Sequence, residues 1–131
     1  AAEFIGRFEL ERKSLAAIAL TTDTSVITSL SNDYNYDMIF SRQCESLVSR
    51  GDVVIGISTS GNSKNVYEGI ITSKNKGASI ITLSGNKGGK IKELSDISII
   101  VDSSITSQIQ EAHRVIYHTI CKIVERQLSE K

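Results

Sequence analysis

Hydroxyl side chains cluster in one short stretch of the chain, Ser58-Thr-Ser-Gly-Asn-Ser63, directly after the apolar run Val53–Ile57. The run predicts a buried strand, and the residues from Ser63 onward have helical spacing. Free N–H groups and the positive end of the helix dipole attract anions at such a junction. Gly61 lets the backbone approach a ligand closely. The stretch therefore predicts a binding site for a phosphate or for sugar hydroxyls, one that needs no lysine.

A simpler interpretation of this stretch is a helix N-cap at Asn62 or Ser63. A cap needs one such residue, whereas this stretch has five polar residues and a glycine in six positions. The GxxxxGK[ST] and GxGxxG patterns of nucleotide-binding loops are absent from the sequence. The stretch therefore favours a phosphate on a molecule smaller than a nucleotide.

Two weaker groups of candidate residues lie elsewhere. Asn32 and Asp33 could bind a polyol, although an Asx turn explains them equally simply. A predicted C-terminal helix carries Gln110, Glu111, His113 and His118 near one side. A histidine there could act as an acid/base group or a metal ligand, or it could simply be packed. Gln110 and His118 are about 12 Å apart along a helix. Their side chains can therefore bind the same ion only at the limit of their reach, or from different copies in an oligomer.

Apolar and helical patterns predict the elements that would position these residues. We expect strands in four β-branched runs: 15–21, 53–59, 79–85 and 97–103. Helical spacing predicts helices over 36–48, 63–76 and 105–128, with a short turn or helix at 90–94. Alternation of strands and helices predicts an α/β fold with a parallel sheet. The length suggests one domain over 1–131, and the N-terminal segment begins as if within a helix, so we expect an earlier part to be missing.

Composition narrows the partners and the compartment. Lys and Arg number 15, as do Asp and Glu, so nucleic acid and anionic membrane are not expected as main partners. Cys44 and Cys121 form no CxxC pair or disulfide framework, which favours packing roles in a reduced, cytoplasmic compartment. No apolar run approaches the roughly 18 residues of a membrane span.

The sequence resembles the phosphoheptose isomerases of the SIS domain family, in order and through nearly all of its length. The segments that carry the resemblance are GRFELERKSLAAIALTTDTS, NDYNYDMIFSRQ, GDVVIGISTSGNSKNV, ITLSGNKGGK and IQEAHRVIYH. GISTSGNS alone marks the wider SIS family, whereas the combination is much narrower. The resemblance implies a three-layer αβα sandwich of flavodoxin-like type, with a five-stranded parallel sheet, in a homotetramer. The family's N-terminal helical region, first strand and glycine-rich loop would be missing from residues 1–131.

The resemblance also implies an activity and a set of site residues. The family converts sedoheptulose 7-phosphate to D-glycero-D-manno-heptose 7-phosphate, for lipopolysaccharide core or capsule. Glu3 and His118 match its acid/base pair. Substrate-binding positions match at Asn32, Asp33, Ser58, Thr59, Ser60, Ser63 and Gln110. Three of four zinc ligands match at Glu3, Gln110 and His118, while the fourth, a histidine, would fall before Ala1, so we expect a 131-residue product to be inactive.

Two other functions compete with the isomerase interpretation. Some SIS proteins bind the replication initiator without known isomerase activity, and others sense sugar phosphates within transcription regulators. Relatives of the first kind have a changed loop and lack the histidine equivalent to His118, whereas both are present here. The second kind usually carries a DNA-binding domain, and none is visible in the sequence. The sequence therefore favours the enzyme.

Overall fold

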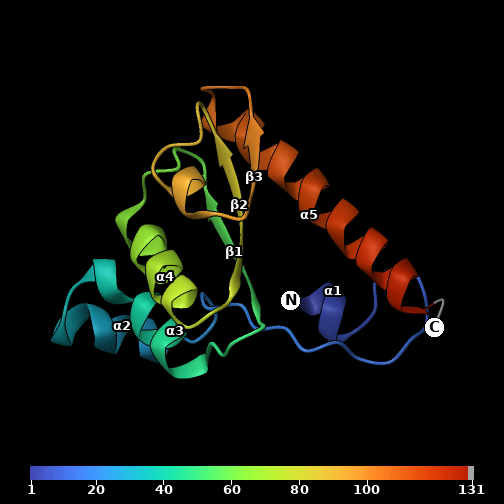
Figure 1. Ribbon diagram of the computed structural model, residues 1–131, viewed down its shortest axis with the longest axis horizontal. Coiled ribbons are helices and arrows are strands. Elements are labelled where there is room, and N and C mark those ends of the chain that lie inside the picture. Colours follow the sequence, from blue (N-terminus) through green and yellow to red (C-terminus); the bar gives the residue numbers. More distant parts are fainter. Residues whose placement is uncertain (130–131) are drawn as a thin grey trace. The chain divides into compact units, whose positions relative to one another are not determined.

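The structure is a computed structural model that describes residues 1–129. The described residues form two compact units. The central unit is Leu20–Gln110, and the terminal unit combines Ala1–Ala19 with the residues from Glu111 onward. Helix α5 (Thr106–Ser129) contributes to both units (Figure 1). The two units are described separately below.

A parallel sheet forms the centre of the central unit. Its strands in the described residues are β1 (Val53–Ser58), β2 (Ser79–Gly85) and β3 (Ile97–Val101), in the order β1-β2-β3. The register pairs Ile57 with Leu83 and Leu83 with Ile99, so all three strands end at the same edge. The predicted α/β class with a parallel sheet is confirmed.

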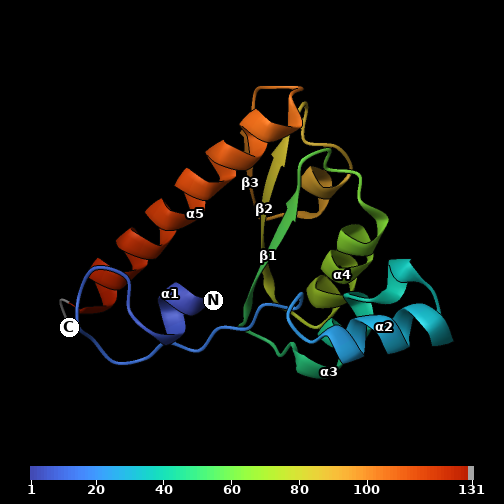
Figure 2. The ribbon, with the colours of Figure 1, turned by 180° about the vertical axis from the view of Figure 1, so that it is seen from behind.

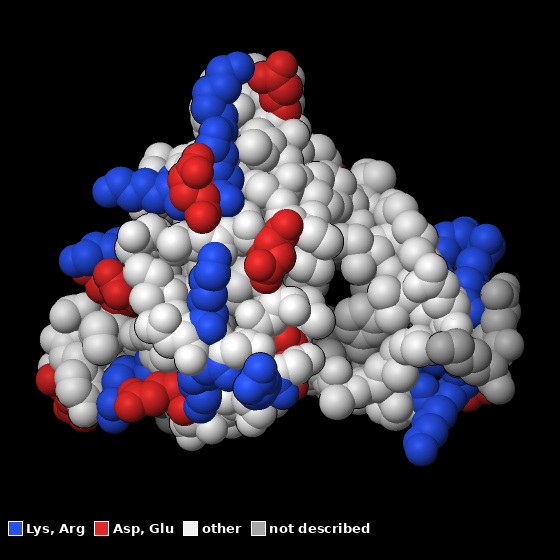
Figure 3. All heavy atoms as spheres, in the orientation of Figure 1, with Lys and Arg blue, Asp and Glu red and all other residues white. Residues whose placement is uncertain are grey.

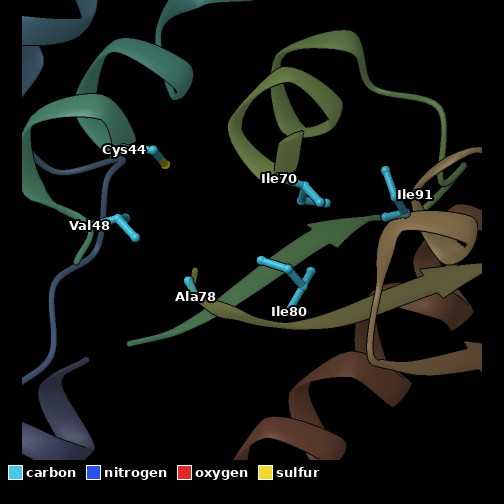
Figure 4. Close-up of a cluster of buried hydrophobic side chains, with 6 residues drawn as sticks. All are labelled: Cys44, Val48, Ile70, Ala78, Ile80 and Ile91. Atoms are coloured by element: carbon cyan, nitrogen blue, oxygen red, sulfur yellow. The ribbon is translucent and has the colours of Figure 1, made fainter. Parts of the chain in front are cut away.

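Helices cover one face of this sheet. Both views place α4 (Lys64–Asn75) and the short 3-10 helix η2 (Ile91–Leu94) on the same side of the strands (Figures 1 and 2). α3 (Ser41–Leu47) packs against α4. A cluster of buried side chains lies between these elements and β2 (Figure 4): Cys44, Val48, Ile70, Ala78, Ile80 and Ile91. Gly56 makes this approach possible, because a Cβ there would lie 2.7 Å from Ile70 Cδ1.

The predicted strand at 15–21 is wrong. These residues are all described, and they form no strand. Their backbone and side chains bond elsewhere: the amide of Leu15 donates to the carbonyl of Phe4, and the carbonyl of Leu20 accepts from Gln43 Nε2. The side chain of Leu20, at the end of this run, is partly buried against the core cluster. The described sheet accordingly has three strands rather than the five that the resemblance implies.

The helix predictions hold with two differences. The predicted helix 36–48 is divided into η1 (Tyr36–Met38) and α3, and the Asn35 side chain caps η1 by accepting from the amide of Asp37. Helix α2 (Thr24–Asp33) was not predicted, although Asp23 caps it by accepting from the amide of Val26. That cap ahead of Val26 and Ile27 is the local pattern that marks its start.

The terminal unit contains α1 (Ala2–Ile5), an irregular segment through residue 19, and the C-terminal part of α5. Over residues 1–129, the structure contains no helix with the length and apolar character needed to cross a membrane.

Candidate functional site

Three hydroxyl groups converge where β1 ends. Ser58 Oγ lies 2.8 Å from Ser63 Oγ and 3.5 Å from Ser60 Oγ. Ser58 is buried at the end of the strand, Ser63 is half-buried and Ser60 is exposed. We call Ser58–Ser63 the hydroxyl loop. It presents a graded set of O–H donors from the buried end of a strand to the surface, which is the arrangement a partly enclosed anion requires.

The start of α4 favours ligand binding over simple capping. Ser63 occupies the N-cap position, but within the described residues its side chain makes no capping hydrogen bond. Its hydroxyl interacts with Ser58 instead. The amide of Val66 in the first turn donates to Asn65 Oδ1 at 2.8 Å, so an external acceptor would meet the two amides before it, those of Lys64 and Asn65.

Lys64, the first residue of α4, is paired away from the loop. Its ammonium lies 2.7 Å from Asp37 Oδ2 of η1. The hydrogen bond and charge of Asp37 raise the pKa of Lys64. This pair fixes α4 to η1 and leaves anion binding to hydroxyls and backbone N–H groups, as the sequence predicts.

The other predicted substrate residues of the central unit lie on the surface. Asn32 and Asp33 are exposed at the C-terminal end of α2. Helix α2 packs on η1, and η1 packs on α4. Gln110 is exposed on α5. An open hollow beyond β2 and β3 is lined by Asn86, Lys87, Asp102, Ser103, Ser104 and Ile105. In the described structure, no residue of the hydroxyl loop lines this hollow. One lining residue, Asn86, contacts the loop, because its Nδ2 donates to the carbonyl of Thr59.

His118 and Glu3 both lie in the terminal unit. The His118 ring stacks on Phe8 at 5.7 Å between centroids and meets Tyr117 edge-on at 4.8 Å. Burial raises the pKa of Cys121, and the negative charge of Glu3 raises it further. Cys121 follows His118 by three residues on α5, so the two side chains are neighbours on one helix face. Phe8, which contacts the His118 ring, follows Glu3 by five residues, so both predicted acid/base residues belong to one unit.

The predicted helix group of four residues does not form one surface. His113 is 3% exposed, whereas Gln110 and Glu111 are exposed. Glu111 lies 4.0 Å from Arg114 at the surface. Only His118 of this group is both half-buried and close to the segment that contains Glu3.

A buried carboxylate that sequence reasoning missed holds the terminal unit together. Glu125 is 1% exposed and accepts from the amides of Phe8, Glu9 and Leu10 at 2.7–3.0 Å. Arg12 Nε donates to it at 3.1 Å, and the same guanidinium donates to the carbonyls of Glu3 and Phe4. Burial acts to raise the pKa of Glu125, but the three amides and Arg12 outweigh it and lower the pKa to about 2. An acidic residue four positions after Cys121, in the apolar spacing of α5, is the feature that could have identified it.

The predicted zinc set consists of one glutamate, one histidine and the amide side chain of Gln110. Zinc takes about four ligands at roughly 2.0–2.3 Å. Among residues 1–129, no three His, Cys, Asp or Glu side chains come together in that way. Gln110 belongs to the central unit and lies about 12 Å along α5 from His118 of the terminal unit. The zinc set of Glu3, Gln110 and His118 thus stays a prediction.

The fold is an α/β domain with a cluster of hydroxyls at the carboxyl edge of a parallel sheet, the edge at which ligands bind in open α/β sheets. A family model described as "SIS domain" matches residues 1–85. Phosphoheptose isomerase of Geobacter sulfurreducens is 51% identical over 98% of this chain and 68% of the relative, and that of Helicobacter pylori is 50% identical over 100% and 68%. The structure of a phosphoheptose isomerase from Neisseria gonorrhoeae is similar with a TM-score of 0.90 and 41% identity, over 96% of this chain and 67% of that one.

The chain belongs to the SIS domain family and, within it, to the phosphoheptose isomerases, a family of enzymes. A further similar structure is a phosphoheptose isomerase from Francisella tularensis, with a TM-score of 0.91 and 34% identity over 95% of this chain. The chain spans about two thirds of the length of the curated relatives it matches.

Proposed function

We propose that the protein is an aldose–ketose isomerase that converts sedoheptulose 7-phosphate to D-glycero-D-manno-heptose 7-phosphate. The observation that carries this proposal is the convergence of Ser58, Ser60 and Ser63 hydroxyls directly before α4, in a chain of the phosphoheptose isomerase family. In this proposal the hydroxyl loop, with Thr59, holds the phosphate. Asn32, Asp33 and Gln110 contact the sugar.

The isomerisation requires a proton to move between C1 and C2 through an enediol. The C–H bond is weakly acidic, so a base must lie over it and a second group must exchange protons with the oxygens. We assign these two roles to Glu3 and His118, which belong to the same unit of the chain. Binding of the remote phosphate fixes C1 and C2 in place, so that binding free energy lowers the barrier of the proton transfer.

The test is incubation of the full-length protein with sedoheptulose 7-phosphate and measurement of aldose formation. Steady conversion that saturates with substrate would support the proposal. Binding of the phosphosugar without any turnover would instead indicate the non-catalytic alternative. Absence of both would remove the hydroxyl loop as a phosphate site.

Ser60→Ala is expected to raise KM about 5- to 10-fold with little change in kcat. The substitution removes one O–H donor to the phosphate, which costs about 1–1.5 kcal/mol of binding, and leaves the acid/base pair untouched. Initial rates over a range of substrate concentrations measure the effect. Ser46→Ala, at an exposed serine of α3, is the matched control and should behave like the wild type. A fall in kcat at constant KM would contradict the assignment.

We also propose that the assembled protein binds one zinc ion per subunit, with Glu3, Gln110 and His118 among its ligands. Bound zinc would stabilise negative charge on the substrate oxygens. Elemental analysis of the full-length protein is expected to find about one zinc per subunit, and much less in His118→Ala. Retention of zinc by His118→Ala, or its absence from the wild type, would exclude this ligand set.

The setting of the enzyme is proposed on the same basis. Both cysteines are buried free thiols, which supports a reducing, cytoplasmic compartment. The separation of Gln110 from His118 along α5 supports a homo-oligomer, for which we propose a tetramer, in which copies share a site. The product would enter heptose synthesis for lipopolysaccharide core or capsule.

A further inference from the structure

The turn that follows β2 lies directly against the hydroxyl loop. Two backbone hydrogen bonds join them: the amide of Gly85 donates to the carbonyl of Thr59 at 3.0 Å, and the amide of Ile91 donates to the carbonyl of Gly61 at 3.1 Å. The segment between these two donors, Asn86–Lys90, forms the turn. The hydroxyl loop is thus supported from a neighbouring strand as well as from its own strand and helix.

Glycines let the two segments approach more closely than side chains would allow. A Cβ on Gly61 would lie 2.0 Å from the carbonyl oxygen of Gly88, and one on Gly89 would lie 2.4 Å from Gly61. Both Gly61 and Gly89 have positive φ, at 68° and 57°. Their backbone conformation and their contact therefore both require glycine. The backbone of the turn therefore packs directly against the backbone of the hydroxyl loop.

Two side chains connect the two segments: Asn86 donates to the carbonyl of Thr59 at 3.3 Å, and Asn62 bonds to the turn and also holds Ser60. Asn62 Oδ1 accepts from the amide of Lys90 at 3.1 Å, and its Nδ2 donates to the carbonyl of Ser60 at 3.1 Å. Its own amide donates to Ser60 Oγ at 3.1 Å. Ser60 Oγ also lies 3.5 Å from Ser58 Oγ, so the Ser60 hydroxyl has two partners within the loop. The Asn62 side chain thus holds the Ser60 carbonyl to the Lys90 amide, while the bond to Ser60 Oγ comes from the Asn62 backbone.

The charges near this contact are mixed. On the face shown in Figure 3, basic and acidic side chains are interspersed. Lys64 is paired with Asp37, and Lys87 lies 3.5 Å from Asp102. The turn itself carries Lys87 and Lys90, both exposed, so basic side chains as well as hydroxyls belong to this region.

We propose that Asn62 is a positioning residue that aligns the hydroxyl loop for a phosphate group by fastening it to the turn at 86–90. The proposal rests on the proposed function of the loop as a phosphate site. It assigns no contact between the Asn62 side chain and the substrate. The side chain acts through Ser60 and through the spacing of the two segments.

The test compares Asn62→Ala with the wild type in substrate turnover and in inhibition by inorganic phosphate. We expect KM for sedoheptulose 7-phosphate and the inhibition constant of phosphate to rise together, about 10-fold, with kcat within about 2-fold, because about two hydrogen bonds of the loop are lost. The melting temperature should hardly change, since Asn62 is exposed. Asn75→Ala, at an exposed asparagine where α4 ends, is the matched control and should match the wild type in every readout.

Two results would overturn the assignment of Asn62. One is an unchanged phosphate inhibition constant in Asn62→Ala. The other is a parallel loss of kcat and melting temperature, which would indicate a structural role. If the wild type itself neither turns over the sugar phosphate nor responds to inorganic phosphate, the proposed function fails instead, so the two failures are distinguishable.

Discussion

His118→Ala is expected to lower kcat by about 10²- to 10⁴-fold, the usual contribution of a positioned acid/base group. The His118 ring is half-buried and held between Phe8 and Tyr117, so its position is fixed before substrate binds. The residues assigned to the phosphate lie in the central unit, whereas His118 lies in the terminal unit. We therefore expect KM to change by no more than a few-fold. Steady-state kinetics on the full-length protein measure both parameters.

A matched variant separates catalysis from folding. Thr119 follows His118 on α5 and is exposed, and its hydroxyl donates to the carbonyl of Val115 within the helix. Thr119→Ala should keep kcat close to the wild-type value. Circular dichroism of both variants should give the same helix content. Turnover by His118→Ala at the wild-type rate would remove His118 from the mechanism and leave the acid/base assignment with Glu3 alone.

Local sequence patterns were sufficient to predict most strands and helices of the central unit. The runs that became β1, β2 and β3 are apolar on both faces and bounded by turn residues, and these properties belong to contiguous sequence. Gly77, with a φ of 85°, follows the C-cap residue of α4, and a glycine at this place is a local signal for the end of a helix. The run 15–21 is also apolar, although richer in alanine, and it has no strand partner in the described structure, because its hydrogen bonds go to Phe4 and Gln43. Strand propensity does not specify a partner strand, and a run joins a sheet only where a partner strand is available to pair with it.

The features of the candidate site also differ in how far they could be predicted from sequence: contiguous features could be, and contacts between distant segments could not. The hydroxyl loop could be predicted because its residues are contiguous and follow a strand. The contact of Gly61 with Gly88 and Gly89 could not, because it joins two loops through backbone proximity. Glu125 and Arg12 are 113 residues apart, and neither position alone indicates a buried pair. Interactions of this range depend on the tertiary fold, which the periodicity of one segment does not contain.

Glu125→Gln is expected to destabilise the terminal unit strongly at neutral pH. Every group that contacts the carboxylate is a donor: Oε1 accepts from Phe8 and Arg12, and Oε2 accepts from Glu9 and Leu10. A glutamine keeps one acceptor oxygen and turns an NH₂ group toward two of these donors. The buried Arg12 guanidinium also loses its counter-charge, which is among the most costly changes that a single substitution makes. We expect the melting temperature to fall by several degrees or more.

The pH dependence identifies the carboxylate as the cause. The pKa of Glu125 is lowered from 4.5 to about 2 in the folded protein, so the folded state favours the ionised form. Its contribution to stability is complete above about pH 4.5 and is lost as the pH falls toward about 2. The difference in the free energy of unfolding between wild type and Glu125→Gln should therefore be largest at neutral pH and shrink through this interval. Urea unfolding between pH 2 and 7 measures it, with Glu11→Gln, at an exposed pair with Arg7, as the control expected to change little. A difference that stays constant across the interval would mean that the charge of Glu125 does not stabilise the fold.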